Sequence, residues 1–200
     1  MGKELMEEFP AFVEDIRAMD RTLAELPCPP SWSIEDELRK PKKTSRVHLA
    51  EFSQSLCTAI QIALVNLFRS WHISPAAVVG HSSGEIAGGY ACNALTAEEA
   101  IIVSYYRGEA ARANTQVGGM AAVGLGRDEV APYLAKGVIV ACENSPSSVT
   151  LSGDLEVLDS VVARLKDELP DVLIRRLHVN MAYHSRTPPS SPNLQHIQHK

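Results

Sequence analysis

The sequence predicts an α/β fold with two parts, and three observations support this prediction. A short apolar run at residues 76–79 leads directly into Gly-His-Ser-Ser-Gly, and a helical pattern begins at about Gly84. Helical segments occupy most of the chain before Met120. From Met120 onward, β-type runs and helical segments follow one another in the order β-α-β-β-α-β. Together these element types place the chain among α/β proteins.

Composition and charge exclude several classes of protein. The 200 residues are 45% hydrophobic and 22% charged, an ordinary profile for a globular chain with a core of its own. The net charge of −5 argues against a surface that binds nucleic acid or an anionic membrane. No apolar run approaches the ~20 residues of a membrane span, and the acidic N-terminus is unlike a signal peptide. The four cysteines lie far apart without CxxC spacing, so we expect reduced thiols, no metal site and a cytoplasmic location.

The first part of the chain reads as a series of helices. Apolar residues at helical spacing predict a helix over residues 3–26, and Ser33 is placed to cap a short helix. Residues 47–71 form a long, strongly apolar pattern, so most of this helix should be buried. Thr96 opens the next helix, with Glu99 three residues later as the second half of a capping box.

The second part reads as a ferredoxin-like subdomain, a recurrent supersecondary unit. Its strands are expected at residues 120–125, 138–142, 148–153 and 172–179, and its helices at residues 128–136 and 155–169. Residues 186–200 are polar, rich in proline and serine, and without periodicity, which predicts disorder.

The Gly-His-Ser-Ser-Gly turn has the pattern of a nucleophile elbow, in which a serine sits on a sharp turn between a strand and a helix. Gly80 and Gly84 should allow the strained turn and the close passage of strand and helix. Ser82 is the candidate nucleophile. The backbone N–H of Ser83, at the start of the helix, is the natural donor to an oxyanion. A glycine-rich loop without catalytic function is the alternative interpretation.

A serine nucleophile needs a base, and seven histidines compete for that role. His81 sits beside Ser82 and could touch a substrate, although neighbours on a tight turn generally point in different directions. His184 directly follows the last predicted strand, so the chain could bring it back toward the serine. The residues alone leave the choice of base open.

Four stretches together resemble the malonyl-CoA:acyl-carrier-protein acyltransferase domain, in the form found in fungal iterative type I polyketide synthases. They read VVGHSSGEIAGGYACNALTAEEAIIVSYYRG, GGMAAVGLG, ENSPSSVTLSGD and MAYHS. The resemblance covers residues 2–185 in the family's order and spacing, and it is far more specific than the serine motif alone.

The resemblance implies roles for individual residues. Ser82 would carry the acyl group as an ester, and His184 would be its general base, oriented by backbone carbonyls instead of an aspartate. Arg107 would hold the free carboxylate of the malonyl group, which suits the fork geometry of a guanidinium. Gln61 and Asn144 fall in family segments near the pocket. Tyr183, just before the histidine, would favour malonyl over methylmalonyl groups.

The resemblance also implies the partners. Malonyl-CoA would be the substrate, the phosphopantetheine thiol of an acyl carrier protein the acceptor, and other polyketide synthase domains the neighbours. The domain itself would bind no cofactor and no metal.

The chain departs from the family pattern at both ends. The family begins with a Gly-Gln-Gly strand that supplies a second oxyanion donor, whereas this sequence starts at the following helix. After Ser185 the family continues with His-His-Met, and here an unrelated sequence begins at Arg186. We therefore expect an incomplete α/β-hydrolase-like parallel-sheet subdomain over residues 1–118 and 178–185, with an inserted ferredoxin-like subdomain over residues 119–177.

Two other functions remain open at this point. A serine esterase or thioesterase would use the same elbow, but it would need an acidic residue in its triad and access for water. An inactive fragment would bind CoA or a carrier protein without turnover.

Overall fold

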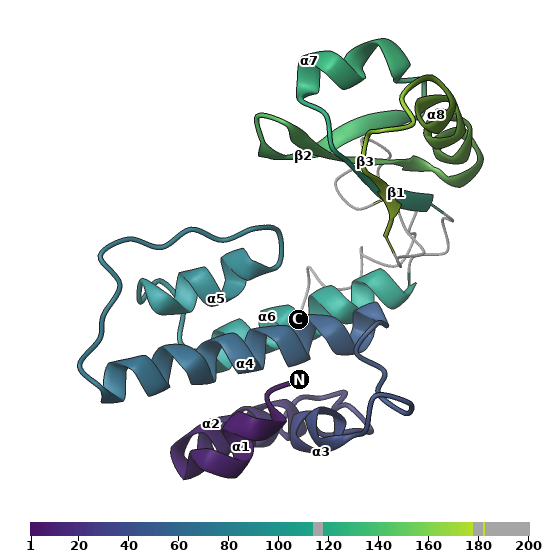
Figure 1. Cartoon of the computed structure of the whole chain (residues 1–200). Helices are drawn as coiled ribbons and strands as arrows, with labels where there is room; N and C mark the ends of the chain where they lie inside the picture. The colour runs from purple at the N-terminus through teal and green to yellow at the C-terminus, as the bar shows by residue number, and fades with distance from the viewer. Residues whose placement is uncertain (114–117, 178–181, 183–200) are drawn as a thin grey trace, which may run out of the picture. The chain divides into compact units, whose positions relative to one another are not determined.

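The computed structural model of the chain describes residues 1–113, 118–177 and 182. The chain divides into two compact units, Met1–Ala113 and Asn114–Lys200, and each has its own hydrophobic core (Figure 1). The division falls a few residues before the boundary predicted at residue 118. Within the described residues, the first unit is helical and the second unit holds a β-sheet. The prediction of an α/β chain with both element types is confirmed.

Helices build the first unit, and most of them begin where the sequence predicts. They are α1 (Lys3–Glu8), α2 (Pro10–Ala24), α3 (Ile34–Arg39), α4 (Ala50–Ser70), α5 (Gly84–Ala91) and α6 (Ala97–Ala113). The single helix predicted over residues 3–26 is wrong, because the chain is extended at Phe9, with φ −123° and ψ 99°. A proline disfavours the helical conformation of the residue before it, so Pro10 ends α1 and starts α2.

The predicted caps hold two of these helices. The hydroxyl of Ser33 accepts a hydrogen bond of 3.1 Å from the backbone N–H of Asp36 at the start of α3. At the start of α6, Thr96 and Glu99 form the reciprocal capping box, with bonds of 2.8 and 3.1 Å. A cap of this kind stabilises a helix by about 1 kcal/mol, which is why its residues can be recognised in the sequence.

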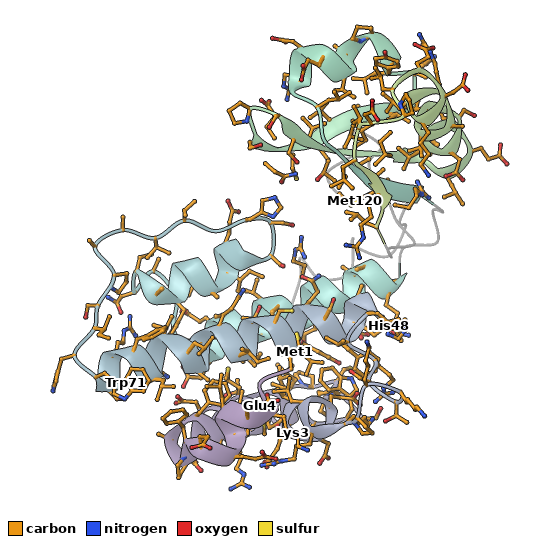
Figure 2. All side chains as sticks on the ribbon, viewed as in Figure 1. Met1, Lys3, Glu4, His48, Trp71 and Met120 are labelled. Atoms are coloured by element: carbon orange, nitrogen blue, oxygen red, sulfur yellow. The ribbon has the colours of Figure 1, made fainter. Side chains whose placement is uncertain are left out.

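Helix α4 is the centre of the first unit, and it packs against α2, α3, α5 and α6 (Figure 1). His48 and Trp71 mark its two ends in Figure 2. Helix α6 approaches α4 closely at Gly108, where an added Cβ would lie 3.1 Å from the Cα of Glu51. The core around α4 is made of large side chains that are almost fully buried, among them Phe12, Ile16, Leu56, Ile62 and Ile101.

The strand expected at residues 76–79 is not formed. This segment is irregular, and Val79 is 96% exposed and Val78 39% exposed. A strand needs a neighbour whose backbone groups complete its hydrogen-bond ladder, and the described residues of the first unit hold no second strand. The predicted parallel sheet is therefore not seen in the described part of the chain.

The second unit has the predicted β-α-β-β-α-β order. Its elements are β1 (Gly118–Val123), α7 (Arg127–Val130), the 3₁₀ helix η1 (Ala131–Tyr133), β2 (Val138–Ser145), β3 (Ser148–Asp154), α8 (Leu155–Glu168) and β4 (Ile174–Arg176). The strands lie in the order β2-β3-β1-β4, and all neighbours are antiparallel. Leu158 and Leu165 of α8 belong to the buried cluster that also contains strand residues Val123 and Leu151.

Two predicted elements of this unit are shorter than expected. The helix predicted to reach residue 136 ends its α-helical part at Val130, and a 3₁₀ turn containing Pro132 follows. Inside an α-helix, proline removes a hydrogen bond and its ring clashes with the preceding turn. The last strand spans Ile174–Arg176. Residues 178 and 179 of the prediction lie outside the described residues.

Candidate active site

Ser82 has the backbone conformation expected of a nucleophile elbow. Its φ is +55°, in the left-handed region that few non-glycine residues adopt. The turn is closed by hydrogen bonds from Gly84 N–H to the His81 carbonyl (3.0 Å) and from Glu85 N–H to the Ser82 carbonyl (3.2 Å). Such a conformation costs about 1–3 kcal/mol and occurs preferentially at functional sites. Ser82 therefore has the backbone conformation of an elbow, although residues 76–79 before it do not form a strand.

Gly80 is the glycine that this turn requires. An added Cβ at Gly80 would lie 2.4 Å from the backbone N and Cα of Glu85, closer than real contacts allow. An added Cβ at Gly84 would meet nothing within 4 Å, so the predicted steric need for a glycine there is wrong. On α5, a Cβ at Gly88 would lie 3.3 Å from Cγ1 of Val78, which shows how closely the helix follows the preceding segment.

Ser83 occupies the N-cap position of α5. Within the described residues, no backbone carbonyl accepts a hydrogen bond from its N–H. The first N–H groups of a helix lack partners inside the helix, and they carry the positive end of its dipole. The N–H of Ser83 therefore has the position and the electrostatic character expected of an oxyanion donor.

Arg107 lies on α6 and reaches the nucleophile. Its Nη2 is 3.4 Å from Oγ of Ser82, a distance at the long end for a hydrogen bond. Its Nη1 donates a hydrogen bond to Oε1 of Gln54 on α4. The turn before α5 and the helices α6 and α4 thus bring a hydroxyl, a guanidinium and an amide to one place. A cation beside Ser82 suits a substrate that carries a negative charge near its reacting carbon.

Gln54 is the site residue that the sequence analysis missed. It is only 9% exposed, whereas Gln61, which the resemblance places near the pocket, is exposed. The two lie on the same helix, and Gln61 is two turns, or about 10 Å, further along. The only sign of Gln54 in the sequence is that it is a polar residue within an apolar helical pattern. Gln61 shares this sign, so the sequence cannot tell the two glutamines apart.

A network of polar side chains fastens α5 to its neighbours. The hydroxyl of Tyr90 on α5 donates a hydrogen bond to Oδ1 of Asn66 on α4. Arg69, also on α4, donates to the carbonyl of Ala91 at 3.0 Å, and its guanidinium carbon lies 5.0 Å from the Tyr90 ring centre. Burial raises the pKa of Asp15 on α2, and a hydrogen bond with Asn66 partly opposes that rise. The C-terminal end of the helix that begins at the elbow is therefore held against α4.

Of the remaining predicted site residues, Asn144 and His81 are described by the structure, whereas Tyr183 and His184 are not. Asn144 is an exposed residue of β2 in the second unit, and its Nδ2 donates a 3.0 Å hydrogen bond to Oγ1 of Thr150. His81 is exposed next to Ser82. Tyr183 and His184 lie outside the described residues.

The part of the chain that the structure describes contains no cluster of three or more histidine, cysteine, aspartate or glutamate residues that could hold a metal ion. In the same residues, no helix is long and apolar enough to cross a membrane.

A family model described as the acyl transferase domain matches residues 1–190. The chain belongs to the acyl transferase domain family. Among curated relatives of this acyl transferase domain, a highly reducing polyketide synthase from Fusarium sp is 58% identical over 185 residues, which is 92% of this chain and 7% of the relative. A highly reducing polyketide synthase from Glarea lozoyensis has the same identity and coverage.

A solved acyltransferase structure has a fold similar to that of this chain. A loading acyltransferase from the avermectin modular polyketide synthase has a TM-score of 0.82 and 30% identity, covering 93% of this chain and 59% of that chain. These findings confirm the resemblance to acyltransferase domains of fungal polyketide synthases. The acyl transferase domain described here spans 7% of the length of the curated relatives it matches.

Proposed function

We propose that this chain transfers a malonyl extender unit from malonyl-CoA to the phosphopantetheine thiol of an acyl carrier protein. The observation that supports this most directly is Arg107 beside Ser82, with Nη2 3.4 Å from Oγ at a strained elbow. A nucleophile with a guanidinium beside it is suited to an acyl group that carries its own carboxylate. Family membership and the polyketide synthase relatives support the same reaction.

The first half of the reaction loads the serine. Oγ of Ser82 attacks the thioester carbonyl of malonyl-CoA, and His184, the base implied by the family pattern, takes the hydroxyl proton. The negative charge on the carbonyl oxygen is stabilised by the N–H of Ser83 at the start of α5. The C–S bond then breaks, and the CoA sulfur leaves with the proton that the histidine returns. The product is a malonyl ester on Ser82.

The second half transfers the acyl group. The phosphopantetheine thiol of the carrier protein gives its proton to His184 and attacks the ester carbonyl, again through a tetrahedral intermediate. The ester bond breaks, and the oxygen of Ser82 regains a proton. No cofactor resides in the domain, because the phosphopantetheine belongs to the carrier protein.

Arg107 supplies the preference for a charged acyl group. Its planar guanidinium can form two parallel hydrogen bonds to a carboxylate, which a lysine cannot match. An acetyl group offers no such partner. The proposal has three further parts. Tyr183 would favour malonyl over methylmalonyl groups, and the pocket would include Gln61, His81 and Asn144. The chain would work in the cytoplasm beside other polyketide synthase domains.

Intact mass spectrometry tests the loading step. The purified chain is incubated with malonyl-CoA, and the Ser82→Ala variant is treated in the same way. A malonyl adduct on the chain, absent from the variant, supports the proposal. No adduct on a chain that circular dichroism shows to be folded contradicts it and favours an inactive fragment.

A second measurement separates transfer from hydrolysis. The loaded chain is mixed with a carrier protein that bears its phosphopantetheine arm, and malonyl carrier protein and free malonate are quantified. Transfer faster than hydrolysis supports the acyltransferase. Release of malonate into water at the same rate with and without the carrier protein favours an esterase.

A further inference from the structure

We propose that residues 39–46, here called the basic loop, form the surface on which an acyl carrier protein docks. The inference rests on the proposed function, and it names the place where the carrier of that reaction binds. The basic loop reads RKPKKTSR, with five cations and no anion in eight residues, whereas the whole chain has a net charge of −5. It runs from the last residue of α3 toward the start of α4.

A buried carboxylate anchors the basic loop at two points. The side chain of Glu37 on α3 is 1% exposed and forms ion pairs with Lys40 and with Arg46. The guanidinium carbon of Arg46 also lies 3.9 Å from the ring centre of Phe52 on α4, a cation–π contact. The basic loop is therefore fastened to both helices and is not a free linker.

The tip of the basic loop is a closed turn that exposes two lysines. The carbonyl of Pro41 accepts hydrogen bonds from the backbone N–H groups of Thr44 (2.9 Å) and Ser45 (3.0 Å). Lys42 and Lys43 lie within this turn and are exposed. In the described part of the chain, no carboxylate forms an ion pair with either lysine. The charge of the tip is thus available to a partner molecule.

A hollow beside the basic loop shows why a protein surface fits this place better than a small anion does. The hollow has a volume of about 570 Å³ and is lined by the cations Arg39, Lys40 and Arg46, but also by the carboxylates of Asp36 and Glu37. Because charges of both signs line it, the hollow does not select an anion that is small enough to enter. The excess positive charge lies at the exposed tip, where an extended anionic surface can reach it.

An acyl carrier protein has the chemistry that such a tip attracts. Its phosphopantetheine arm is attached through a phosphate diester, so the face that presents the arm is negatively charged at the attachment point. The net charge of −5 makes most of this chain unfavourable for an anionic partner. The basic loop therefore steers the carrier to one place on the first unit.

The basic loop and the nucleophile are connected to the same end of α4. Arg46 contacts Phe52, which lies in the first turn of that helix. Gln54, two residues further on, accepts a hydrogen bond from Arg107, and Nη2 of Arg107 is 3.4 Å from Oγ of Ser82. A carrier held at the basic loop is thus placed at the end of α4 where its long, flexible arm has to deliver the thiol.

Binding of a carrier protein that lacks its arm tests the surface directly. The probe is a fluorescently labelled acyl carrier protein domain from a fungal polyketide synthase, and its dissociation constant is measured by anisotropy at low ionic strength. The double variant Lys42→Glu, Lys43→Glu should weaken binding about tenfold. Replacing both lysines by glutamine should weaken it less, and replacing both by arginine should leave it unchanged. Added salt should weaken binding to the wild type, because it screens exposed charges.

Lys136 and Lys166 provide the matched control, because they are exposed lysines of the second unit. Each change from lysine to glutamate lowers the charge by two, so both double glutamate variants have a net charge of −9 instead of −5. The control variant Lys136→Glu, Lys166→Glu should bind the carrier within about twofold of the wild type. Circular dichroism checks that every variant is folded, and the glutamine variant remains informative if the glutamate variant is not.

A kinetic experiment separates docking from the chemical steps. Transfer from the loaded serine is measured to a carrier protein that bears its arm and to free pantetheine, which has no protein surface. The double glutamate variant of Lys42 and Lys43 should lower kcat/KM for the carrier protein about tenfold. Transfer to pantetheine and loading from malonyl-CoA should stay unchanged, because neither needs the docking surface.

Four results would overturn the inference. They are a carrier protein that does not bind the wild type, unchanged binding in the double glutamate variant of the basic loop, an equal loss in the control variant, and an equal loss with pantetheine or in loading from malonyl-CoA. The last of these would show that the lysines serve the fold or CoA. Failure of the proposed function is seen separately, as the absence of a malonyl adduct on Ser82 of the unaltered chain, and the binding measurements do not depend on that adduct.

Discussion

Arg107 and Ser82 lie on different helices, yet Nη2 of the arginine is 3.4 Å from Oγ of the serine. Helix α6 presents the arginine from its third turn, and the elbow presents the serine just before α5. The contact places a guanidinium beside the hydroxyl that we propose as the nucleophile. A carboxylate on an acyl group attached to that hydroxyl would lie within reach of this cation.

Replacing Arg107 should change acyl-group selectivity more than the basic reaction. With Arg107→Ala, we expect kcat/KM for malonyl-CoA to fall about a hundredfold, because a charge-assisted bidentate pair is lost. Arg107→Lys keeps the positive charge but loses the two-pronged guanidinium geometry, so its kcat/KM for malonyl-CoA should lie between those of the wild type and Arg107→Ala. Loading rates with malonyl-CoA and acetyl-CoA are compared by mass spectrometry. An equal fall for both substrates would show that Arg107 supports the fold and does not select the substrate.

Gly80 and Gly84 form a matched pair for testing the elbow. Gly80→Ala should destabilise the first unit by about 2–4 kcal/mol, because its Cβ would lie 2.4 Å from the backbone of Glu85. Gly84→Ala should change the free energy of unfolding by less than about 1 kcal/mol, because its Cβ meets nothing within 4 Å. Urea unfolding followed by tryptophan fluorescence measures both, since Trp32 and Trp71 lie in the first unit. Equal effects of the two substitutions would contradict the steric role of Gly80.

Features set by local chemistry could be predicted from the sequence. The Ser33 cap and the Thr96–Glu99 capping box involve residues three apart, so their pattern is visible without the fold. The β-α-β-β-α-β order was likewise readable from periodicity. The break at Phe9 was also local, and Pro10 signals it, but the apolar spacing on both sides concealed it.

Features set by distant partners could not be predicted in the same way. The apolar run at residues 76–79 has the composition of a strand, but a strand also depends on a neighbour that no local pattern supplies. Gln54 and Gln61 are both glutamines within the same apolar helix. Only the contact between α4 and α6 decides that Gln54 meets Arg107. The roles of Tyr183 and His184 stay predictions, because these residues lie outside the described part of the chain.

The hydroxyl of Tyr90 should contribute to the stability of the helix that follows the elbow. Tyr90→Phe removes the hydrogen bond to Asn66 and leaves that half-buried amide without this donor, so we expect a loss of about 1 kcal/mol. Tyr106→Phe is the control, because Tyr106 is 44% exposed and should change stability by no more than about 0.5 kcal/mol. Urea unfolding at neutral pH compares them. Equal stability of the two variants would mean that the Tyr90 hydrogen bond adds nothing.

Glu37 should make the stability of the first unit depend on acid. Its side chain is 1% exposed and forms ion pairs with Lys40 and Arg46. Burial acts to raise the pKa of Glu37, but hydrogen bonds from Arg46 and Lys40 outweigh it, and the pKa lies below its usual value. An unfolded glutamate takes up a proton near pH 4.3, whereas the folded one resists until a lower pH. The unfolded state therefore binds more protons in this window, and stability falls as the pH drops through it.

Glu37→Gln tests that prediction, because glutamine cannot be protonated in this range. At neutral pH the variant should be less stable by about 1–2 kcal/mol, a modest figure because Lys40 and Arg46 are partly exposed to solvent. The difference between the two proteins should shrink as the pH falls from about 6 to about 3, since the wild type loses the charged form of Glu37. Glu14→Gln, at an ion pair with Arg21 in which both side chains are 62% exposed, should differ from the wild type by less than about 0.5 kcal/mol at neutral pH. A difference between wild type and Glu37→Gln that stays constant over the whole range, measured by tryptophan fluorescence in urea, would show that the ion pairs of Glu37 do not govern the acid sensitivity.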